Sequence, residues 1–159
     1  MDSPKTPKIT DPKIALTKAE RYCTYQDRAQ QEVRDKLYEW GLWPEAVENI
    51  IAQLISDSFL NEERFAKAYT LGKFRQKGWG KTKIKQGLKL KKVSDALIKK
   101  ALQQIDGDDY EMMLSALLAK KARLITDKDP FKRRFKLQQY AYSRGYEADI
   151  IAGLLSKTD

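Results

Sequence analysis

The residues most able to do chemistry in this sequence are cations, and they gather in one stretch of the chain. Nine lysines and arginines stand in the 20 residues from Lys73 to Lys92, and no acidic residue interrupts them. Like charges three or four positions apart on a helix repel by about 0.2–0.5 kcal/mol per pair. Such a run is often only a solvated face, but a polyanionic partner would explain its density. The chemistry to expect is binding of nucleic-acid phosphates or of an acidic protein surface.

We therefore predict a partner-binding surface made of these cations and one aromatic side chain. Its members in this stretch are Lys73, Arg75, Lys77, Trp79, Lys81, Lys83, Lys85, Lys89, Lys91 and Lys92. Trp79 is included because it lies at a turn, where we expect it to be more exposed than Trp43. Trp40 follows the helical spacing of the apolar residues before it and is predicted to be in the core.

The sequence contains no convincing motif for catalysis. The triplet Gly80 to Thr82, GKT, imitates the end of a phosphate-binding loop, but the first glycine of that motif would stand at the position of Arg75. Gly78 and Gly80 are better explained as the end of one helix and a close turn into the next. The chain has no histidine, which removes the commonest general base and zinc ligand. We expect no catalytic, metal or cofactor site, and no enzymatic activity.

The charge and the cysteine content favour a cytoplasmic protein. The net charge of +9 divides into −2 over residues 1–57 (8 basic, 10 acidic), +10 over 58–105 (13 and 3) and +1 over 106–159 (10 and 9). Cys23 is the single cysteine, so no internal disulfide is possible and a reducing compartment is expected. No stretch has the apolar length of a signal peptide or a membrane span.

The elements that must position these cations are predicted to be helices. From Ala15 onward the apolar residues recur every three or four positions, which predicts an all-α fold. The segment 33–54 also aligns with 84–105 at a shift of 51 residues, with Leu37 on Leu88 and Val47 on Ile98. A weaker third copy follows after a further 53 residues. Internal repeats of this kind predict stacked helical units.

Each copy is interpreted as a leading helix followed by a helix pair with a tight turn. The leading helices are placed near 12–23, 61–77 and 109–124, and Asn61, Pro44 and Ser94 have the residue types of helix starts. The predicted organisation is a flexible tail over 1–14 and three-helix repeats over 15–57, 58–106 and 107–159. Stacking of such units predicts an elongated, curved molecule, which we expect to be a monomer.

A second cationic group stands in the third repeat. It consists of Lys132, Arg133, Arg134 and Lys136, with Phe131 and Phe135 beside it. One interpretation extends the basic surface into this repeat. The other is an ordinary amphipathic helix whose aromatic side chains face the core and whose cations face water.

Two segments resemble the RecX family of regulatory proteins. The signature consists of FLNEERFAKAY from Phe59, then Arg75, the turn GWG and Ile84, with Arg64, Phe65, Ala66 and Tyr69 at its matching positions. QQEVRDKLYEWG from Gln30 resembles the family's first repeat, although serine is commoner at the position of Gln30. The resemblance covers about residues 15–155 and implies tandem three-helix units. It adds Arg64 and Tyr69 to the predicted partner-binding residues.

The resemblance implies a function that composition alone does not supply. Members of this family bind the RecA recombinase filament on single-stranded DNA and restrain its ATP hydrolysis, strand exchange and co-protease activity, in DNA repair and the SOS response. The alternative is a stand-alone, non-specific binder of single- or double-stranded DNA with helix-turn-helix-like units. For that alternative, the helix near 95–105 offers only Lys99, Lys100, Gln103 and Gln104 as outward side chains, which favours phosphate contact over base readout.

Overall fold

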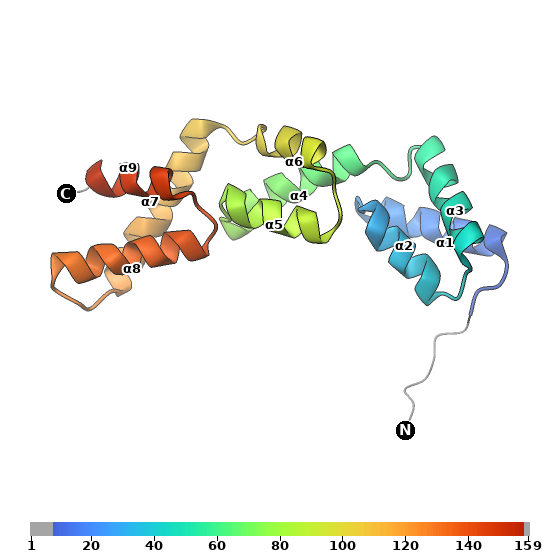
Figure 1. The fold of residues 1–159 in the computed structure, drawn as a ribbon, viewed down its shortest axis with the longest axis horizontal. Helices are drawn as coiled ribbons and strands as arrows, with labels where there is room; N and C mark the ends of the chain where they lie inside the picture. The colour runs from blue at the N-terminus through green and yellow to red at the C-terminus, as the bar shows by residue number, and fades with distance from the viewer. Residues whose placement is uncertain (1–7, 158–159) are drawn as a thin grey trace, which may run out of the picture. The chain divides into compact units, whose positions relative to one another are not determined.

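The computed structural model describes residues 8–157, and this part of the chain is built from nine α-helices without a strand (Figure 1). The helices are α1 (Pro12–Tyr25), α2 (Gln30–Glu39), α3 (Pro44–Ser56), α4 (Glu62–Lys77), α5 (Lys81–Leu90), α6 (Asp95–Leu102), α7 (Gly107–Leu124), α8 (Pro130–Ser143) and α9 (Ala148–Lys157). The all-α prediction is confirmed, and the three leading helices are α1, α4 and α7.

The predicted helix starts are present. The side chain of Asn61 accepts a hydrogen bond from the backbone N–H of Arg64 over 3.0 Å, and that of Ser94 accepts one from Leu97 over 3.4 Å. Pro44 stands at the first position of α3. The side chains of Asn61 and Ser94 satisfy backbone N–H groups that have no partner within the helix.

Residues 1–7 of the predicted tail lie outside the described range. In the part that is described, Ile9 donates its backbone N–H to the carbonyl oxygen of Trp40 over 2.8 Å, and its side chain packs against buried residues of α1 to α3. Helix α1 begins at Pro12. The packed chain therefore begins before the predicted boundary at residue 15.

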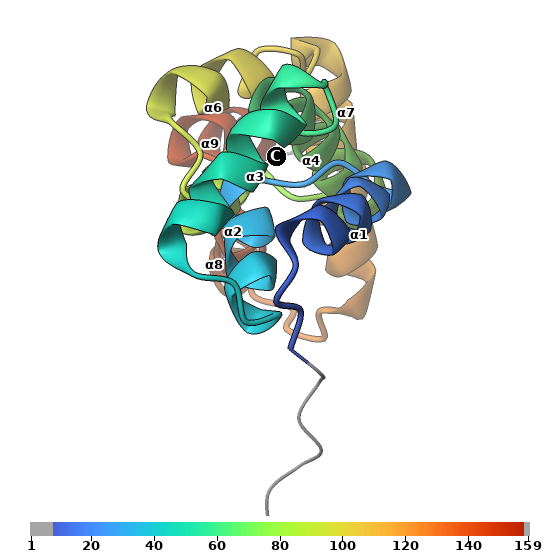
Figure 2. The same ribbon diagram turned by 90° about the vertical axis from the view of Figure 1, so that its right-hand side faces the viewer.

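The described chain forms two compact units, and the boundary between them falls within α4. The first unit comprises residues up to Ala66 together with Lys91–Val93, and the second comprises Lys67–Leu90 and everything from Ser94 onward. In the first unit, α1, α2 and α3 pack against one another around a shared core (Figure 2). In the second, α5 packs against α6, and α7, α8 and α9 pack together (Figure 1).

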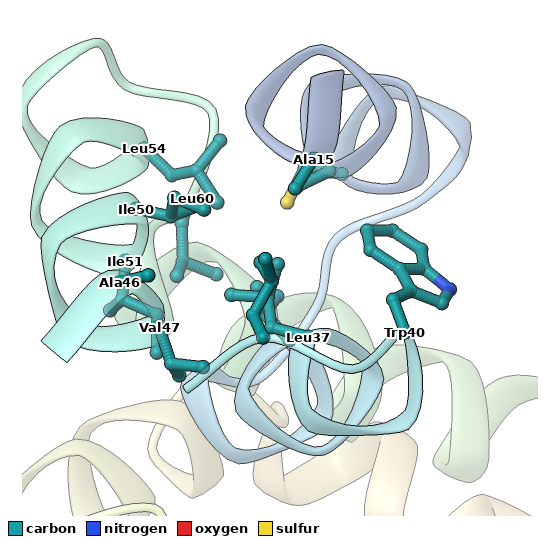
Figure 3. Close-up of a cluster of buried hydrophobic side chains, with 13 residues drawn as sticks. Ala15, Leu37, Trp40, Ala46, Val47, Ile50, Ile51, Leu54 and Leu60 are labelled. Carbon is teal, nitrogen blue, oxygen red and sulfur yellow. The ribbon is translucent and has the colours of Figure 1, made fainter. Parts of the chain in front are cut away.

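The core of the first unit is a cluster of aliphatic side chains from its three helices. Leu37 of α2 and Leu54 of α3 are completely buried, and Ala15 of α1 lies opposite them (Figure 3). Trp40 is 5% exposed and closes one side of this cluster, which confirms its predicted core position. Burial of side chains of this size stabilises the fold by about 1.5–3 kcal/mol each.

In the second unit, a set of backbone hydrogen bonds joins the turn after α4 to the turn before α9. We call this set the joint. The N–H groups of Gly80 and Thr82 donate to the carbonyl oxygens of Arg144 and Gly145 over 2.8 and 2.9 Å, and the hydroxyl of Tyr146 donates to the carbonyl of Gly78 over 3.0 Å. Gly78 has φ +67°, as expected for a glycine that ends a helix. The joint connects the second repeat directly to the third.

Candidate partner-binding surface

Three of the predicted cations form a row on α5. Lys81, Lys85 and Lys89 are four residues apart, so successive turns of the helix place them on one face. They line one side of a groove whose other side is α6, where the lining residues are Asp95, Ile98, Lys99, Leu102 and Gln103. We call this feature the cationic groove. Its walls carry lysines, and its apolar lining comes from the buried Ile98 and the half-buried Leu102.

The charge of the cationic groove is strongly positive. Four lysines line it against one carboxylate, that of Asp95. Asp95 stands in the first turn of α6, where the helix dipole favours a negative side chain. The ammonium groups of Lys85, Lys89 and Lys99 belong to exposed side chains. A groove of this kind suits phosphate groups or the carboxylates of an acidic peptide.

Outside the groove, Trp79 lies between two lysines. The ammonium nitrogen of Lys73 is 4.9 Å from the centre of the Trp79 ring and that of Lys83 is 4.7 Å from it. Lys73 also lies 5.4 Å from the ring centre of Tyr69. Cation–π contacts of this length hold the lysines close together in spite of their charge. The structure thus brings Tyr69, Lys73, Trp79 and Lys83 together as one cluster.

The prediction that Trp79 is more exposed than Trp43 is wrong. Trp43 is 48% exposed, whereas Trp79 is only half-buried between its lysines and is not among the exposed large apolar side chains of the described chain. Its backbone N–H also donates to the backbone carbonyl of Lys73 over 3.1 Å, so the residue closes the end of α4. The two ammonium groups lie over its ring and so cover part of it.

Arg64, Lys91 and Lys92 belong to the first unit and not to the unit that carries the groove. Arg64 pairs with Asp27 through its Nε at 2.5 Å and donates to the carbonyl oxygens of Ser58 and Phe59 over 3.3 Å each. These bonds tie the start of α4 to the segment after α3 and to the loop between α1 and α2, which is a structural role. Lys91 lies 3.8 Å from Glu32, and Lys92 adopts φ +59° in the turn after α5.

The remaining predicted residues occupy two different environments. Arg75 and Lys77 are exposed in the last turn of α4. The half-buried Tyr69 lies directly over the backbone of α5, since a side chain at Gly87 would overlap with its hydroxyl. Tyr69 therefore supports α5 in addition to facing Lys73.

Several residues of this region lie outside the predicted set. Lys99 and Gln103 line the groove, although the sequence suggests them only as outward side chains facing DNA. Asp95, Lys99 and Gln103 follow one another at intervals of four residues, which places them on one face of α6. Tyr110 was missed entirely. Its hydroxyl accepts the N–H of Lys81 over 2.8 Å and donates to the carboxylate of Glu147. Burial and the bond to Glu147 raise the pKa of Tyr110. This pairing over 37 residues leaves no local signal in the sequence.

Helix α8 contradicts its interpretation as an amphipathic helix with aromatic residues in the core. Phe131 is 79% and Phe135 is 54% exposed. Arg133 faces the protein instead, where its guanidinium donates to the carbonyl oxygens of Ala122, Ile125 and Asp127 over 2.9 Å each. The carbonyl groups at the end of α7 need donors, and Arg133 is the residue of α8 that reaches them.

Within residues 8–157, no group of three or more cysteine, aspartate or glutamate side chains is placed to hold a metal ion. None of the helices in this range has the length and apolar character required to cross a bilayer. The segment before GKT is the helix α4, whereas a phosphate-binding loop follows a strand.

Comparison with protein families gives matches along nearly the whole described chain. Residues 15–54 match "RecX, first three-helix domain", residues 61–102 match "RecX, second three-helix domain" and residues 108–155 match "RecX, third three-helix domain". The three matched ranges correspond to α1–α3, α4–α6 and α7–α9. The order of the predicted helical repeats agrees with that of the family's domains.

Curated relatives carry the same description. A "Regulatory protein RecX" of Thermotoga maritima is 30% identical over 148 residues, which cover 92% of this chain and 86% of that protein. Another, of Clostridium perfringens, is 32% identical over 132 residues, or 82% of this chain and 61% of the relative. One of Bacillus licheniformis is 28% identical and is covered over 57% of its length. The chain thus spans about three fifths of several of the curated relatives that it matches.

Solved structures share the fold. A crystal structure described as RecX from Lactobacillus salivarius superposes with a TM-score of 0.85 at 23% identity, covering 92% of this chain and 95% of that one. A second, described as regulatory protein RecX, gives a TM-score of 0.81 at 23% identity over 87% of this chain. At this level of identity the likeness concerns the arrangement of the helices.

Proposed function

Because this chain belongs to the RecX family of regulatory proteins, we propose that it binds the RecA filament on single-stranded DNA and restrains it. The activities restrained are ATP hydrolysis, strand exchange and co-protease activity. The observation that carries the proposal is the cationic groove, which is lined by four lysines and one carboxylate and in which Lys85, Lys89 and Lys99 are exposed. A nucleoprotein filament presents both phosphates and acidic side chains, and either would be attracted to this groove.

The mechanism needs no catalytic group in this protein. Many separate charge contacts along a row of lysines give binding that weakens steeply as salt rises. A protein held in this way across neighbouring filament subunits opposes the rearrangements that accompany ATP hydrolysis and subunit exchange. We propose that the protein acts as a monomer in the cytoplasm, as a regulator and not as an enzyme.

The basic and aromatic residues of the predicted surface divide between three roles. Lys81, Lys85 and Lys89 form the row that faces the partner, and Lys99 supplies the opposite wall. Lys73, Trp79 and Lys83 form a separate cluster outside the groove, in which each ammonium group lies over the indole ring. Such contacts restrict the lysine side chains before binding and so lower the entropic cost of binding. Arg64 and Lys91 are assigned to structure, since each has an acidic partner.

A second candidate function is non-specific DNA binding without RecA. It is favoured by the position of the positive charge, which lies mainly on α5, the first helix of the α5–α6 pair. In helix-turn-helix proteins the second helix reads bases, so this arrangement contacts phosphates. Such binding would be insensitive to sequence and would compete with RecA for DNA.

The test is RecA ATP hydrolysis on single-stranded DNA in the presence of this protein. We expect wild-type protein to inhibit at substoichiometric amounts and Lys81→Glu/Lys85→Glu/Lys89→Glu to lose most of the inhibition. The matched control is Lys13→Glu/Arg21→Glu/Lys120→Glu, which changes the net charge equally at exposed positions away from the groove and should inhibit like wild type.

Two outcomes would contradict the RecA-specific function. In one, inhibition appears only when the protein coats the DNA and extends equally to an unrelated DNA-dependent ATPase, which identifies a DNA binder. In the other, the groove and control variants lose inhibition to the same extent, which shows that net charge and not the groove is responsible.

A further inference from the structure

Three exposed aromatic side chains form a stripe along α8. Phe131 is 79%, Phe135 54% and Tyr142 68% exposed. They stand at intervals of four and seven residues, which places them on one face of the helix. We call them the aromatic stripe. All three belong to the second unit and to the third repeat.

The aromatic stripe is not required by the core of this repeat. The side of α8 that faces the protein is supplied by the buried Ala141 and by Arg133 with its three carbonyl partners. Rings of this size usually bury 150–250 Å² each in folded proteins. Contiguous exposed apolar side chains, unlike single ones, are typical of interaction surfaces.

The surroundings of the stripe carry positive charge. Helix α8 contains four basic residues and no acidic one, and Lys132 is exposed between the two phenylalanines in sequence. The two carboxylates that precede the helix are already engaged. Asp127 pairs with Lys136, and Asp129 caps the helix by accepting the N–H of Phe131 over 3.1 Å. An incoming anion therefore meets little repulsion here.

We propose that the aromatic stripe is a stacking platform for the unpaired bases of a single-stranded nucleic acid. The rings receive bases on their faces, and the exposed Lys132 contacts a phosphate beside them. A docked protein helix would favour a continuous aliphatic surface, whereas the amide of Gln138 stands between Phe135 and Tyr142 on this face. A row of rings interrupted by an amide and flanked by a lysine fits a chain of bases and phosphates better than it fits a protein helix.

This platform is separate from the cationic groove. The groove lies on α5 and α6 of the second repeat, while the stripe lies on α8. The inference does not depend on RecA, so its main test contains only the protein and an oligonucleotide, and RecA is added only to identify a protein-docking surface. Failure of one proposal therefore leaves the other standing.

The experiment compares two fluorescently labelled oligonucleotides of equal length by anisotropy, one of thymidines and one of abasic sugar-phosphates. Wild-type protein should bind the thymidine strand more tightly. Phe131→Ala/Phe135→Ala should weaken that binding by about 10-fold or more, the loss expected when stacked bases lose their rings. The same variant should bind both strands equally, because its remaining contacts are to the backbone.

Matched variants separate stacking from general effects. Phe131→Tyr/Phe135→Tyr keeps the rings and should retain the preference for thymidine. Met112→Ala removes an exposed apolar side chain from α7, where it is 69% exposed, and should behave like wild type. Lys132→Gln should weaken binding to both strands by the same factor and reduce the dependence of affinity on salt.

The proposal is overturned if the double alanine variant binds thymidines as wild type does, or loses affinity equally for both strands. It is also overturned if this variant keeps its affinity for thymidines but no longer inhibits RecA, because the stripe would then be a protein-docking surface. Far-UV circular dichroism shows whether each variant remains helical.

Discussion

The backbone N–H of Gly80 donates a hydrogen bond to the carbonyl oxygen of Arg144 over 2.8 Å. These residues are in the turns of two different repeats, so the bond fixes the second repeat to the third within one unit. A side chain at Gly80 has no room, since its Cβ would lie 2.5 Å from the backbone nitrogen of Tyr146. The glycine of the family signature is thus explained by a contact between repeats and not by a partner.

Gly80→Ala should accordingly destabilise the second unit. Because the neighbouring atoms are backbone, they cannot move aside, and we expect a loss of about 1–3 kcal/mol in the free energy of unfolding. The matched control is Gly72→Ala in α4, where a Cβ would meet no atom within 4 Å and where alanine should stabilise the helix by about 0.5–1 kcal/mol. Urea denaturation followed by circular dichroism measures both. Equal stability of the two variants would contradict the role of the joint.

Arg133 should be the structurally important cation of α8. Its guanidinium satisfies three carbonyl oxygens near the end of α7, so Arg133→Gln should lower the free energy of unfolding by about 2 kcal/mol. The adjacent Lys132 is exposed, and Lys132→Gln should change it by less than about 0.5 kcal/mol. If Lys132→Gln lowered the stability more than Arg133→Gln in thermal or urea denaturation, Arg133 would not be the residue of α8 that faces the protein.

The stability of the second unit should decrease at alkaline pH. Burial raises the pKa values of Tyr110 and Tyr146 above the ordinary value of 10.0. Above pH 10 the unfolded chain releases these protons while the folded chain keeps them, so unfolding becomes more favourable as pH rises. Melting temperatures measured from pH 7 to 11 should fall less steeply for Tyr110→Phe than for wild type. Tyr25→Phe, at an 83% exposed position, should retain the wild-type slope.

Quenching of tryptophan fluorescence by acrylamide should report the exposure of the three indoles. Trp43 is 48% and Trp40 5% exposed, and Trp79 is half-buried. Trp43→Phe should therefore reduce the quenching constant more than Trp79→Phe does. In Trp43→Phe/Trp79→Phe, the remaining Trp40 should be nearly inaccessible. A larger effect of Trp79→Phe would restore the expectation drawn from the sequence.

Much of this fold could be predicted from the sequence because its signals are local. The spacing of Leu37, Val47 and Ile51 gives the helices, and Asn61 and Ser94 mark where helices begin. The row of Lys81, Lys85 and Lys89 is likewise predictable, since a period of four puts side chains on one helix face. The predicted elongated shape and the domain boundaries stay predictions.

The parts that were missed depend on contacts between distant residues. Nothing near Tyr110 in the sequence indicates that it bonds to Glu147 or accepts the N–H of Lys81. The periodic pattern of α8 fits two orientations of the helix about its axis, one with Phe131 facing the core and one with Phe131 facing solvent. The unsatisfied carbonyl groups at the end of α7 decide between them, because they attract Arg133 and so turn Phe131 to the surface. Pattern alone does not contain that information.

The joint between the second and third repeats is made mainly from backbone atoms. Gly78, Gly80, Arg144 and Gly145 contribute N–H or carbonyl groups to it, so it does not depend on the chemical identity of the neighbouring surface residues. Lys81 and Lys83 can consequently be exchanged for other side chains while the repeats stay attached to each other. Substitutions at these surface positions can therefore change which partner the protein binds while the contact between the repeats stays the same.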